Sequence, residues 1–201
     1  MRIRSLLTLA SLAASLTGLN AGAQAAKPEF EYKIDPVNSS VVFKVLNRDV
    51  SYVYGRFDDL AGVIIVDNRK NPKRFDVRCT IPAKSVDTNS KKRDKHLKGG
   101  DFFNVKKFKE ISFETKKSKK VTEGRFELEG ELTFMGKTLP LTVDLDFTGA
   151  KSMGSQRLIG AHVSFTIKRS EFGMNKQLKG IADEVAIFVS LQAVYKMPPA
   201  G

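Results

Sequence analysis

Residues 125–148 read RFELEGELTFMGKTLPLTVDLDFT, and this stretch decides the fold class. From Phe126 to Phe134, and again from Leu139 to Phe147, every second residue is apolar, with Gly130 as the exception. Successive side chains of a β-strand point to opposite faces, so each run predicts a strand with one apolar and one polar face. The intervening Met135-Gly136-Lys137 predicts a tight hairpin turn, because glycine tolerates a positive φ.

The same alternation extends along most of the chain. Residues 74–81, with the sequence RFDVRCTI, repeat it. Further strands are expected at 30–34, 40–46, 50–57, 62–67, 111–115, 158–168 and 185–195. Two segments, 85–109 and 170–183, do not alternate, and the first is expected to contain a short helix or a 3₁₀ turn.

An all-β chain of about eight antiparallel strands can bury its apolar faces in a sandwich or in a closed barrel. Several runs have ten or more residues, a rise of about 33 Å, against roughly five or six residues in an average strand. Long strands joined by tight hairpins favour a tall, tilted barrel. An eight-stranded barrel has an interior that side chains just fill or that holds one small ligand. The apolar rows contain many phenylalanines and no tryptophan, so a slender apolar chain would fit between them.

The expected lumen is the apolar face of these strands. Its candidate lining residues are Val41, Phe43, Val45, Phe57, Val77, Ile81, Phe113, Phe126, Leu128, Leu132, Phe134, Leu141, Val143, Leu145, Phe165, Ile167, Ile187 and Val189. Nothing in these rows suits a metal or a cofactor.

No catalytic or metal-binding constellation is recognisable in the sequence. The chain has two histidines, His96 and His162, and one cysteine, without zinc-ligand spacing. No nucleophile accompanies a base and an orienting group, and no glycine-rich phosphate loop is present. We therefore expect no catalytic residue, no metal and no cofactor. Cys79 lies in an apolar row and is expected to be a small buried side chain.

Residues 1–25 have the features of a secretory signal peptide. Arg2 and Arg4 precede an apolar region, and Ala23-Gln24-Ala25 offers the small residues that a signal peptidase accepts. The apolar region is short for a bilayer span, although an N-terminal anchor is the alternative. Cleavage after Ala25 would leave one domain, residues 26–201, in the periplasm or outside the cell.

The formal net charge of +12 is compatible with nucleic-acid, anionic-lipid or polyanion binding. Because the lysines are spread over many segments, we favour a basic surface without a nucleic-acid partner. The run Lys116-Lys117-Ser118-Lys119-Lys120 is expected at a hairpin tip. Such a tip is either solvated or in transient contact with an anionic membrane surface, where each charge contributes about 1 kcal/mol.

Residues 93–108 combine several charges, a histidine and three phenylalanines. In one interpretation the segment is a plug whose aromatic side chains cap one barrel end, while Arg93 and Asp94 satisfy each other and the turn backbone. In the other it is a lid that contacts a ligand headgroup. Both use the same candidates, which are Arg93, Asp94, His96, Phe102 and Phe103.

Several short motifs, each weak alone, are specific in their order and spacing. They are IDPVNSSV (34–41), VYGRF (53–57), AG (61–62), RDKHL (93–97), DFF (101–103), GELT (130–133), GKT (136–138), KRSEFGM (168–174) and IADEV (181–185). On these motifs the chain resembles, from Tyr32 to Val194, the YceI-like family of exported lipid-binding proteins, also called polyisoprenoid-binding. The resemblance implies an extended, lipocalin-like, antiparallel eight-stranded barrel with a short helical element capping one end. It also implies a long isoprenoid or fatty-acyl ligand in the lumen, and a homodimer.

The chain departs from the family at the expected headgroup end. The family usually has histidines where this chain has Asn38 and Asn47, and an aromatic-proline pair where it has Phe108-Lys109. We assign both asparagines to the mouth and headgroup contacts. Asparagine donates and accepts hydrogen bonds but does not titrate near neutral pH, so the headgroup preference stays open.

The leading hypothesis is a periplasmic or secreted binding protein, not an enzyme, that carries or sequesters a long-chain apolar lipid of the isoprenoid-quinone or fatty-acyl type. One alternative is a lipid-headgroup enzyme that uses His96 and Asp94. The other is a basic protein that binds anionic envelope polymers, and its binding would weaken steeply with salt.

Overall fold

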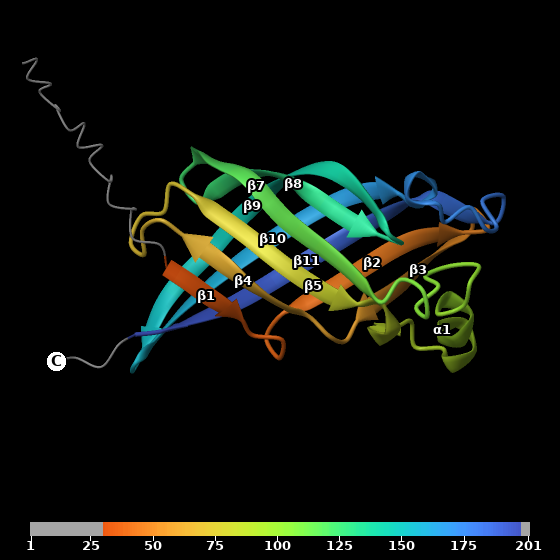
Figure 1. Cartoon of the computed structure of the whole chain (residues 1–201), viewed down its shortest axis with the longest axis horizontal. Coiled ribbons are helices and arrows are strands. Elements are labelled where there is room, and N and C mark those ends of the chain that lie inside the picture. The colour runs from red at the N-terminus through yellow and green to blue at the C-terminus, as the bar shows by residue number, and fades with distance from the viewer. Residues whose placement is uncertain (1–29, 198–201) are drawn as a thin grey trace, which may run out of the picture.

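The computed structural model describes residues 30–197 (Figure 1), so the signal peptide expected at 1–25 lies outside the described residues. All of the strands belong to one antiparallel sheet. The strands are β1 Phe30–Ile34, β2 Ser40–Asn47, β3 Ser51–Phe57, β4 Ala61–Val66, β5 Phe75–Pro82, β6 Val86–Asp87, β7 Glu110–Thr122, β8 Arg125–Phe134, β9 Lys137–Met153, β10 Gln156–Lys168 and β11 Ile181–Lys196. The all-β class predicted from the alternation is confirmed.

The sheet closes on itself. Its order runs β1-β4-β5-β7-β8-β9-β10-β11, and β11 pairs back with β1, which makes an eight-stranded antiparallel barrel. Closure leaves no exposed edge along this ring. The predicted eight-stranded barrel is therefore confirmed.

The remaining strands prolong the barrel at one end. Along the same edge of β11, β1 pairs with Ala193 and Val194, and β2 pairs with residues from Ser190 to Ile181. The next strands follow the same course, since β4 pairs with β1 and β3 with β2. Thus β1 and β2, and likewise β3 and β4, are long strands interrupted by a short bend.

The bend between β1 and β2 is an Asx turn. The Asp35 carboxylate accepts hydrogen bonds from the Val37 backbone N–H (3.0 Å) and from Asn38 Nδ2 (2.7 Å). Asp and Asn favour such turns because their short side chains bond to the nearby backbone. Asn38 is exposed here and does not line the cavity described below, so its expected place at the mouth is wrong.

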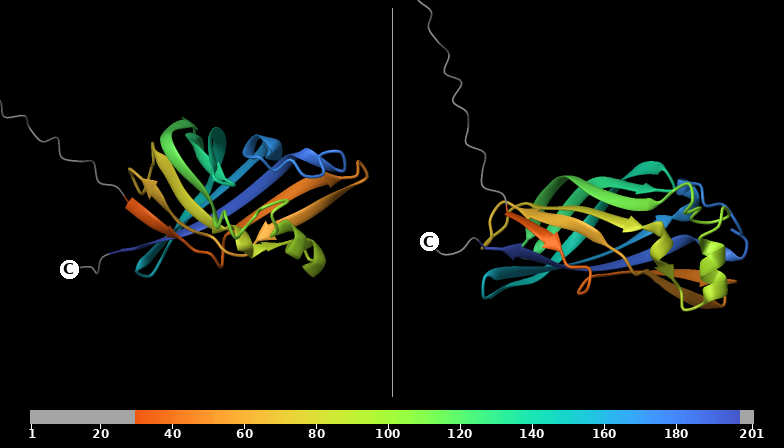
Figure 2. Two further views of the ribbon diagram at one scale, coloured as in Figure 1. Left: turned by 45° about the vertical axis from the view of Figure 1, so that its right-hand side comes forward. Right: turned by 60° about the horizontal axis from the view of Figure 1, so that its bottom comes forward.

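The barrel is elongated, and its two ends differ (Figures 1 and 2). At one end lie both ends of the described chain and the turns at 67–74, 123–124 and 154–155; we call this the terminal end. At the other end, the α1 end, lie the β2–β3 turn, helix α1 and the loop before β11.

The α1 end is covered by the two segments that do not alternate. Residues 83–109 contain a 3₁₀ helix (η1, Ala83–Ser85), β6 and α1 (Lys91–Leu97). A second 3₁₀ helix, η2 (Arg169–Phe172), follows β10. The predicted short helical element at one barrel end is therefore confirmed. Within residues 30–197, neither α1 nor the 3₁₀ helices have the length and apolar character of a membrane span.

The lysine run at 116–120 lies inside β7 and not at a hairpin tip, which corrects the sequence prediction. The β7–β8 turn follows at 123–124. Lysines of β7 pair across the strands with glutamates of β8: Lys117 with Glu129 at 3.3 Å, and Lys119 with Glu127 at 2.6 Å. Because β8 supplies a glutamate at every second position, this run is largely neutralised and does not form an unpaired basic patch.

Candidate functional site

The interior of the barrel is packed in its terminal half. Phe75 and Phe126 lie with ring centroids 5.3 Å apart, and Phe126 is only 1% exposed. Tyr32, Ile64 and Leu145 are equally enclosed. Phe126 and Leu145 were expected in the ligand lumen, but they belong to this packed core and line no cavity. The correction has a simple cause: alternation reveals which face is apolar but not how deep along the barrel a side chain lies.

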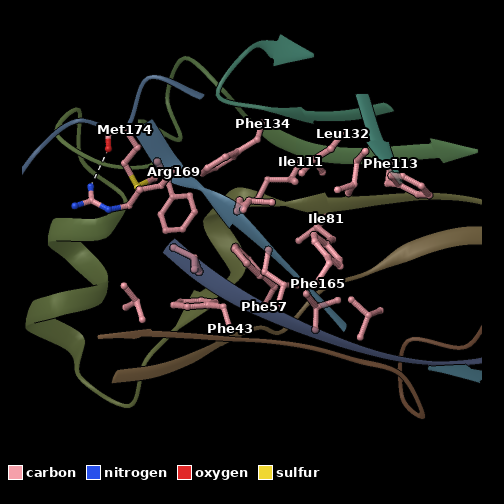
Figure 3. Close-up of a pocket in the computed structure, with 18 of the residues that line it drawn as sticks. Phe43, Phe57, Ile81, Ile111, Phe113, Leu132, Phe134, Phe165, Arg169 and Met174 are labelled. Atoms are coloured by element: carbon pink, nitrogen blue, oxygen red, sulfur yellow. Dashed lines mark hydrogen bonds between the residues drawn. The ribbon is translucent and has the colours of Figure 1, made fainter. Parts of the chain in front are cut away.

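The half of the barrel toward α1 is hollow. A cavity of about 260 Å³ opens there (Figure 3). Apart from Phe126 and Leu145, every residue expected in the lumen lines it. These residues are Val41, Phe43, Val45, Phe57, Val77, Ile81, Phe113, Leu128, Leu132, Phe134, Leu141, Val143, Phe165, Ile167, Ile187 and Val189.

Many inward-pointing side chains of the hollow half are only half-buried. Phe43, Phe165 and Ile187 alternate inward like the core residues of the terminal half, yet retain solvent-accessible surface. Protein interiors are normally packed to the density of organic crystals, so an apolar face left open is an exception. Fully burying a large apolar side chain contributes about 1.5–3 kcal/mol, and a half-buried one forgoes part of this free energy. An apolar guest in the cavity would recover part of this free energy.

Aromatic side chains form one wall of the cavity near its mouth. Phe57 lies between Phe43 and Phe103, with ring centroids 5.8 and 5.7 Å away. Phe103 in turn contacts Phe134 at 5.7 Å. Phe102 and Phe103 are both buried and line the cavity, so the DFF motif forms part of the lumen wall near the α1 end.

Gly55 makes room for this wall. It lies opposite Phe43 in the β2–β3 pair, and a Cβ placed on it would lie 2.2 Å from Cζ of the Phe43 ring. Glycine therefore lets the Phe43 ring lie flat across β3.

Sequence reasoning missed several lining residues. Val163, Val185 and Leu191 occur in alternating rows and could have been included by extending those rows. Three others lie in or near the two segments without alternating apolar residues, where no periodicity indicates which side chains point inward. These are Leu97, Met174 and Ile181. The other missed residues are Val53, Leu60, Cys79, Thr88, Ile111, Ser112 and Arg169.

Cys79 sits in the cavity wall among apolar side chains. Burial raises the pKa of its thiol to about 11, partly offset by a hydrogen bond from the Phe113 backbone. At neutral pH the group is therefore the unreactive thiol, which agrees with its interpretation as a small apolar residue.

Arg93 and Asp94 meet at Thr88 and do not pair directly. The Asp94 carboxylate accepts hydrogen bonds from the Thr88 backbone N–H (2.9 Å) and hydroxyl (2.6 Å). Arg93 donates to the Thr88 hydroxyl at 2.7 Å and carbonyl at 2.6 Å. This network anchors α1 to the chain just after β6. Thr88 and Arg93 line the cavity, whereas Asp94 does not.

His96 lies outside the cavity. Its Nε2 is 3.6 Å from an Asp101 carboxylate oxygen, and its ring stands edge-on to Phe102. Of the two residues named for a lipid-headgroup enzyme, His96 thus lies near Asp101, and Asp94 accepts hydrogen bonds from Thr88. Among residues 30–197 no group of three His, Cys, Asp or Glu side chains could hold a metal.

Arg169 is the most deeply buried charged residue of the site. Its guanidinium donates to the backbone carbonyls of Ala182 (2.9 Å), Met174 (2.8 Å), Lys176 (2.9 Å) and Ile181 (2.8 Å). Figure 3 shows it beside Met174. Burial lowers the pKa of Arg169 from its usual value, and the charge of Asp183 opposes that shift. The side chain thus holds the 170–183 loop over the cavity mouth.

The polar groups of the cavity are concentrated at this mouth. Asn47, at the end of β2, lines the cavity together with Thr88, Arg93 and Arg169. The rest of the lining is almost wholly apolar. This division suits an amphiphile with a long apolar chain and a small polar end.

Comparisons with known proteins agree with this architecture. A family model described as "YceI-like domain" matches residues 32–193. A UPF0312 protein of Pseudomonas aeruginosa (strain LESB58) is 35% identical over 191 residues, covering 93% of this chain and 97% of that protein. A UPF0312 protein of Serratia proteamaculans is 34% identical, covering 93% and 96%.

Solved structures share the fold. The YceI protein of Campylobacter jejuni is 27% identical with a TM-score of 0.66, covering 74% of this chain and 88% of that one. BcnA of Burkholderia cenocepacia has a TM-score of 0.68 at 22% identity, covering 80% and 99%. A polyisoprenoid binding domain from Saccharophagus degradans has a TM-score of 0.60 at 13% identity, covering 84% and 99%. On the family model and the curated relatives, this chain belongs to the YceI-like family.

Proposed function

We propose that this protein binds the apolar chain of a long lipid, of the isoprenoid or fatty-acyl type, in the hollow half of its barrel. The observation that carries the proposal is the half-buried apolar face described above, which side chains leave unfilled inside a barrel whose sheet closes on itself. Apolar cavities of this kind do not hold water well and accept apolar guests.

The small volume of the cavity supports a slender guest. Its volume of about 260 Å³ lies just below the range of roughly 300–1,000 Å³ found for ligand pockets. A narrow polyisoprenoid or acyl chain fits such a space better than a bulky polycyclic molecule. The relationship to the Saccharophagus degradans domain, which is named for polyisoprenoid binding, supports the same ligand class.

We further propose a binding role without catalysis, as a carrier or sequestering protein in the periplasm or outside the cell. The signal-peptide features of residues 1–25 support export. If the signal peptide is cleaved after Ala25, the protein isolated from its host begins at Ala26, and mass spectrometry of the intact chain measures this. The homodimer expected from the resemblance stays a prediction.

A pair of tryptophan variants on one strand tests lipid binding in the lumen. Val189 lines the cavity, whereas the next residue of β11, Ser190, is exposed on the outer face. Val189→Trp should fill the cavity, and Ser190→Trp should add the same side chain without entering it. Titration with a fluorescent long-chain fatty acid, with prenyl quinones as competitors, measures the consequence.

We expect wild type and Ser190→Trp to bind alike, and Val189→Trp to bind at least tenfold more weakly. Circular dichroism and the unfolding midpoint would establish that both variants retain the fold. Equal binding by Val189→Trp and Ser190→Trp would place the ligand outside the barrel and refute the proposal.

A further inference from the structure

Half of the formal net charge of the chain comes from one short segment at the α1 end. Residues 83–109 contain nine lysines and arginines but only three acidic residues, a net charge of +6 within a total of +12. In β7 and β8, by contrast, lysines lie opposite glutamates. A large share of the excess positive charge therefore lies at the end at which the cavity opens.

The few acidic side chains of this segment are already engaged. Asp94 accepts hydrogen bonds from Thr88, Asp87 lies 3.2 Å from Arg56, and Asp101 lies near His96 and Lys176. Six exposed lysines at this end have no acidic side chain within 4 Å among residues 30–197. These six, which we call the cationic rim, are Lys91, Lys92, Lys95, Lys106, Lys107 and Lys179.

Two contacts hold together the segments at this end of the molecule. The Arg48 backbone N–H donates to the Gly180 carbonyl at 2.8 Å, joining the β2–β3 turn, which carries no rim lysine, to the loop that carries Lys179. Lys176 Nζ lies 3.5 Å from Asp101, which connects that same loop with the segment after α1. The rim lysines therefore belong to segments at one end of the molecule, where Figures 1 and 2 show α1 and the loop before β11.

Exposed apolar side chains occur at the same end. Val50, in the β2–β3 turn, is 85% exposed, and Leu178, in the adjoining loop, is 41% exposed. Beside the turn, the outer face of β3 presents Tyr52 and Tyr54, both more than half exposed. A highly charged, soluble polymer would not bury protruding aliphatic side chains favourably. A bilayer interface accommodates them, together with tyrosine and lysine.

We propose that the α1 end is a docking surface for membranes containing anionic phospholipid, with the cationic rim on the headgroups and with Val50 and Leu178 inserted between them. Each basic residue near such a surface changes the affinity by about fivefold, so six make a substantial attraction. The docked orientation would turn the cavity mouth toward the bilayer. A lipid could then pass between membrane and barrel without its chain crossing water; this consequence, unlike the docking itself, rests on the proposed function.

Two triple variants with equal charge change test the docking surface. Lys92→Gln, Lys95→Gln and Lys179→Gln together remove half of the rim. The control combines Lys70→Gln, Lys73→Gln and Lys151→Gln, three exposed lysines at the terminal end. Cosedimentation with vesicles of phosphatidylcholine mixed with phosphatidylglycerol, compared with pure phosphatidylcholine, measures binding of the mature chain.

We expect binding only to the mixed vesicles, about 100-fold weaker in the rim variant and nearly unchanged in the control. Val50→Ser with Leu178→Ser should also weaken binding, and that loss should persist at high salt, where charge attraction is screened. Lumen binding of the fluorescent fatty acid should be the same in all variants, which separates this proposal from the proposed function.

Equal weakening by both triple variants, or the absence of binding to the mixed vesicles, would overturn the proposal. Rim-dependent binding to heparin without vesicle binding would also overturn it and would assign the rim to soluble polyanions instead.

Discussion

Arg169 satisfies four backbone carbonyl groups with one side chain, and it does so at the mouth of the cavity. In Arg169→Gln those carbonyls would stay buried without donors, at a cost of about 3 kcal/mol in the free energy of unfolding. Urea denaturation measures the loss. The exposed neighbour Lys168 is the control, and Lys168→Gln should change stability by less than about 0.5 kcal/mol. Similar stability of Arg169→Gln and wild type would show that the loop does not depend on the guanidinium.

Asp183 makes the same loop sensitive to acid. Its carboxylate accepts hydrogen bonds from the Ser170 hydroxyl (2.7 Å) and backbone N–H (2.8 Å), and these bonds lower the pKa of Asp183 below its ordinary value of 3.8. A carboxyl whose pKa is lower in the folded state stabilises that state above the unfolded-state pKa, and the contribution disappears as pH falls through the folded-state pKa.

Wild type should therefore be more stable than Asp183→Asn at neutral pH, and the difference should shrink below about pH 4. Thermal unfolding of both proteins across this range is the measurement. A difference that stays constant down to acidic pH would exclude ionisation of Asp183 as its source.

At the scale of single elements, removing a phenylalanine ring from a strand should cost more stability in the packed half of the barrel than in the hollow half. Phe126 of β8 is 1% exposed in the packed half, whereas Phe165 of β10 is half-buried in the cavity wall. Phe126→Ala should cost about 3–5 kcal/mol of stability. Phe165→Ala should cost about 1–2 kcal/mol, because part of its ring already faces open space. Urea denaturation of the ligand-free proteins compares them, and equal losses would mean that the cavity is as tightly packed as the core.

The same contrast explains what could be predicted from the sequence. Period-2 alternation identified the strands and their apolar faces, since a one-residue error would expose a whole row. It could not separate Phe126 from Phe134, which share a row of β8 but lie in the packed and hollow halves. Position along the barrel depends on register and stagger between strands distant in sequence.

The positions of the loop residues in the site could not be predicted for a different reason. Arg169 and Met174 enter the site through a turn whose geometry is set by tertiary hydrogen bonds, and no periodicity marks it. Asn38 was misplaced because a motif position was carried over without the Asx turn that directs it outward. The lysines of 116–120 looked like a turn because they are charged, yet β8 pairs them with glutamates.

For the molecule as a whole, an apolar lumen predicts a chain-length dependence of binding. Each buried methylene contributes about 0.8 kcal/mol, so lengthening a saturated fatty acid by two carbons should tighten binding by about tenfold until the cavity is full. Because lumen binding is driven by burial, it should change little with salt. Affinity that is independent of chain length but sensitive to salt would point to a charged surface site instead.

The most direct test of lipid binding in the barrel is native mass spectrometry of the protein purified from its own host. We expect one long apolar lipid per chain, retained by Ser190→Trp and absent from Val189→Trp. An empty wild-type barrel across repeated preparations, with no uptake of added prenyl or acyl lipids, would contradict it.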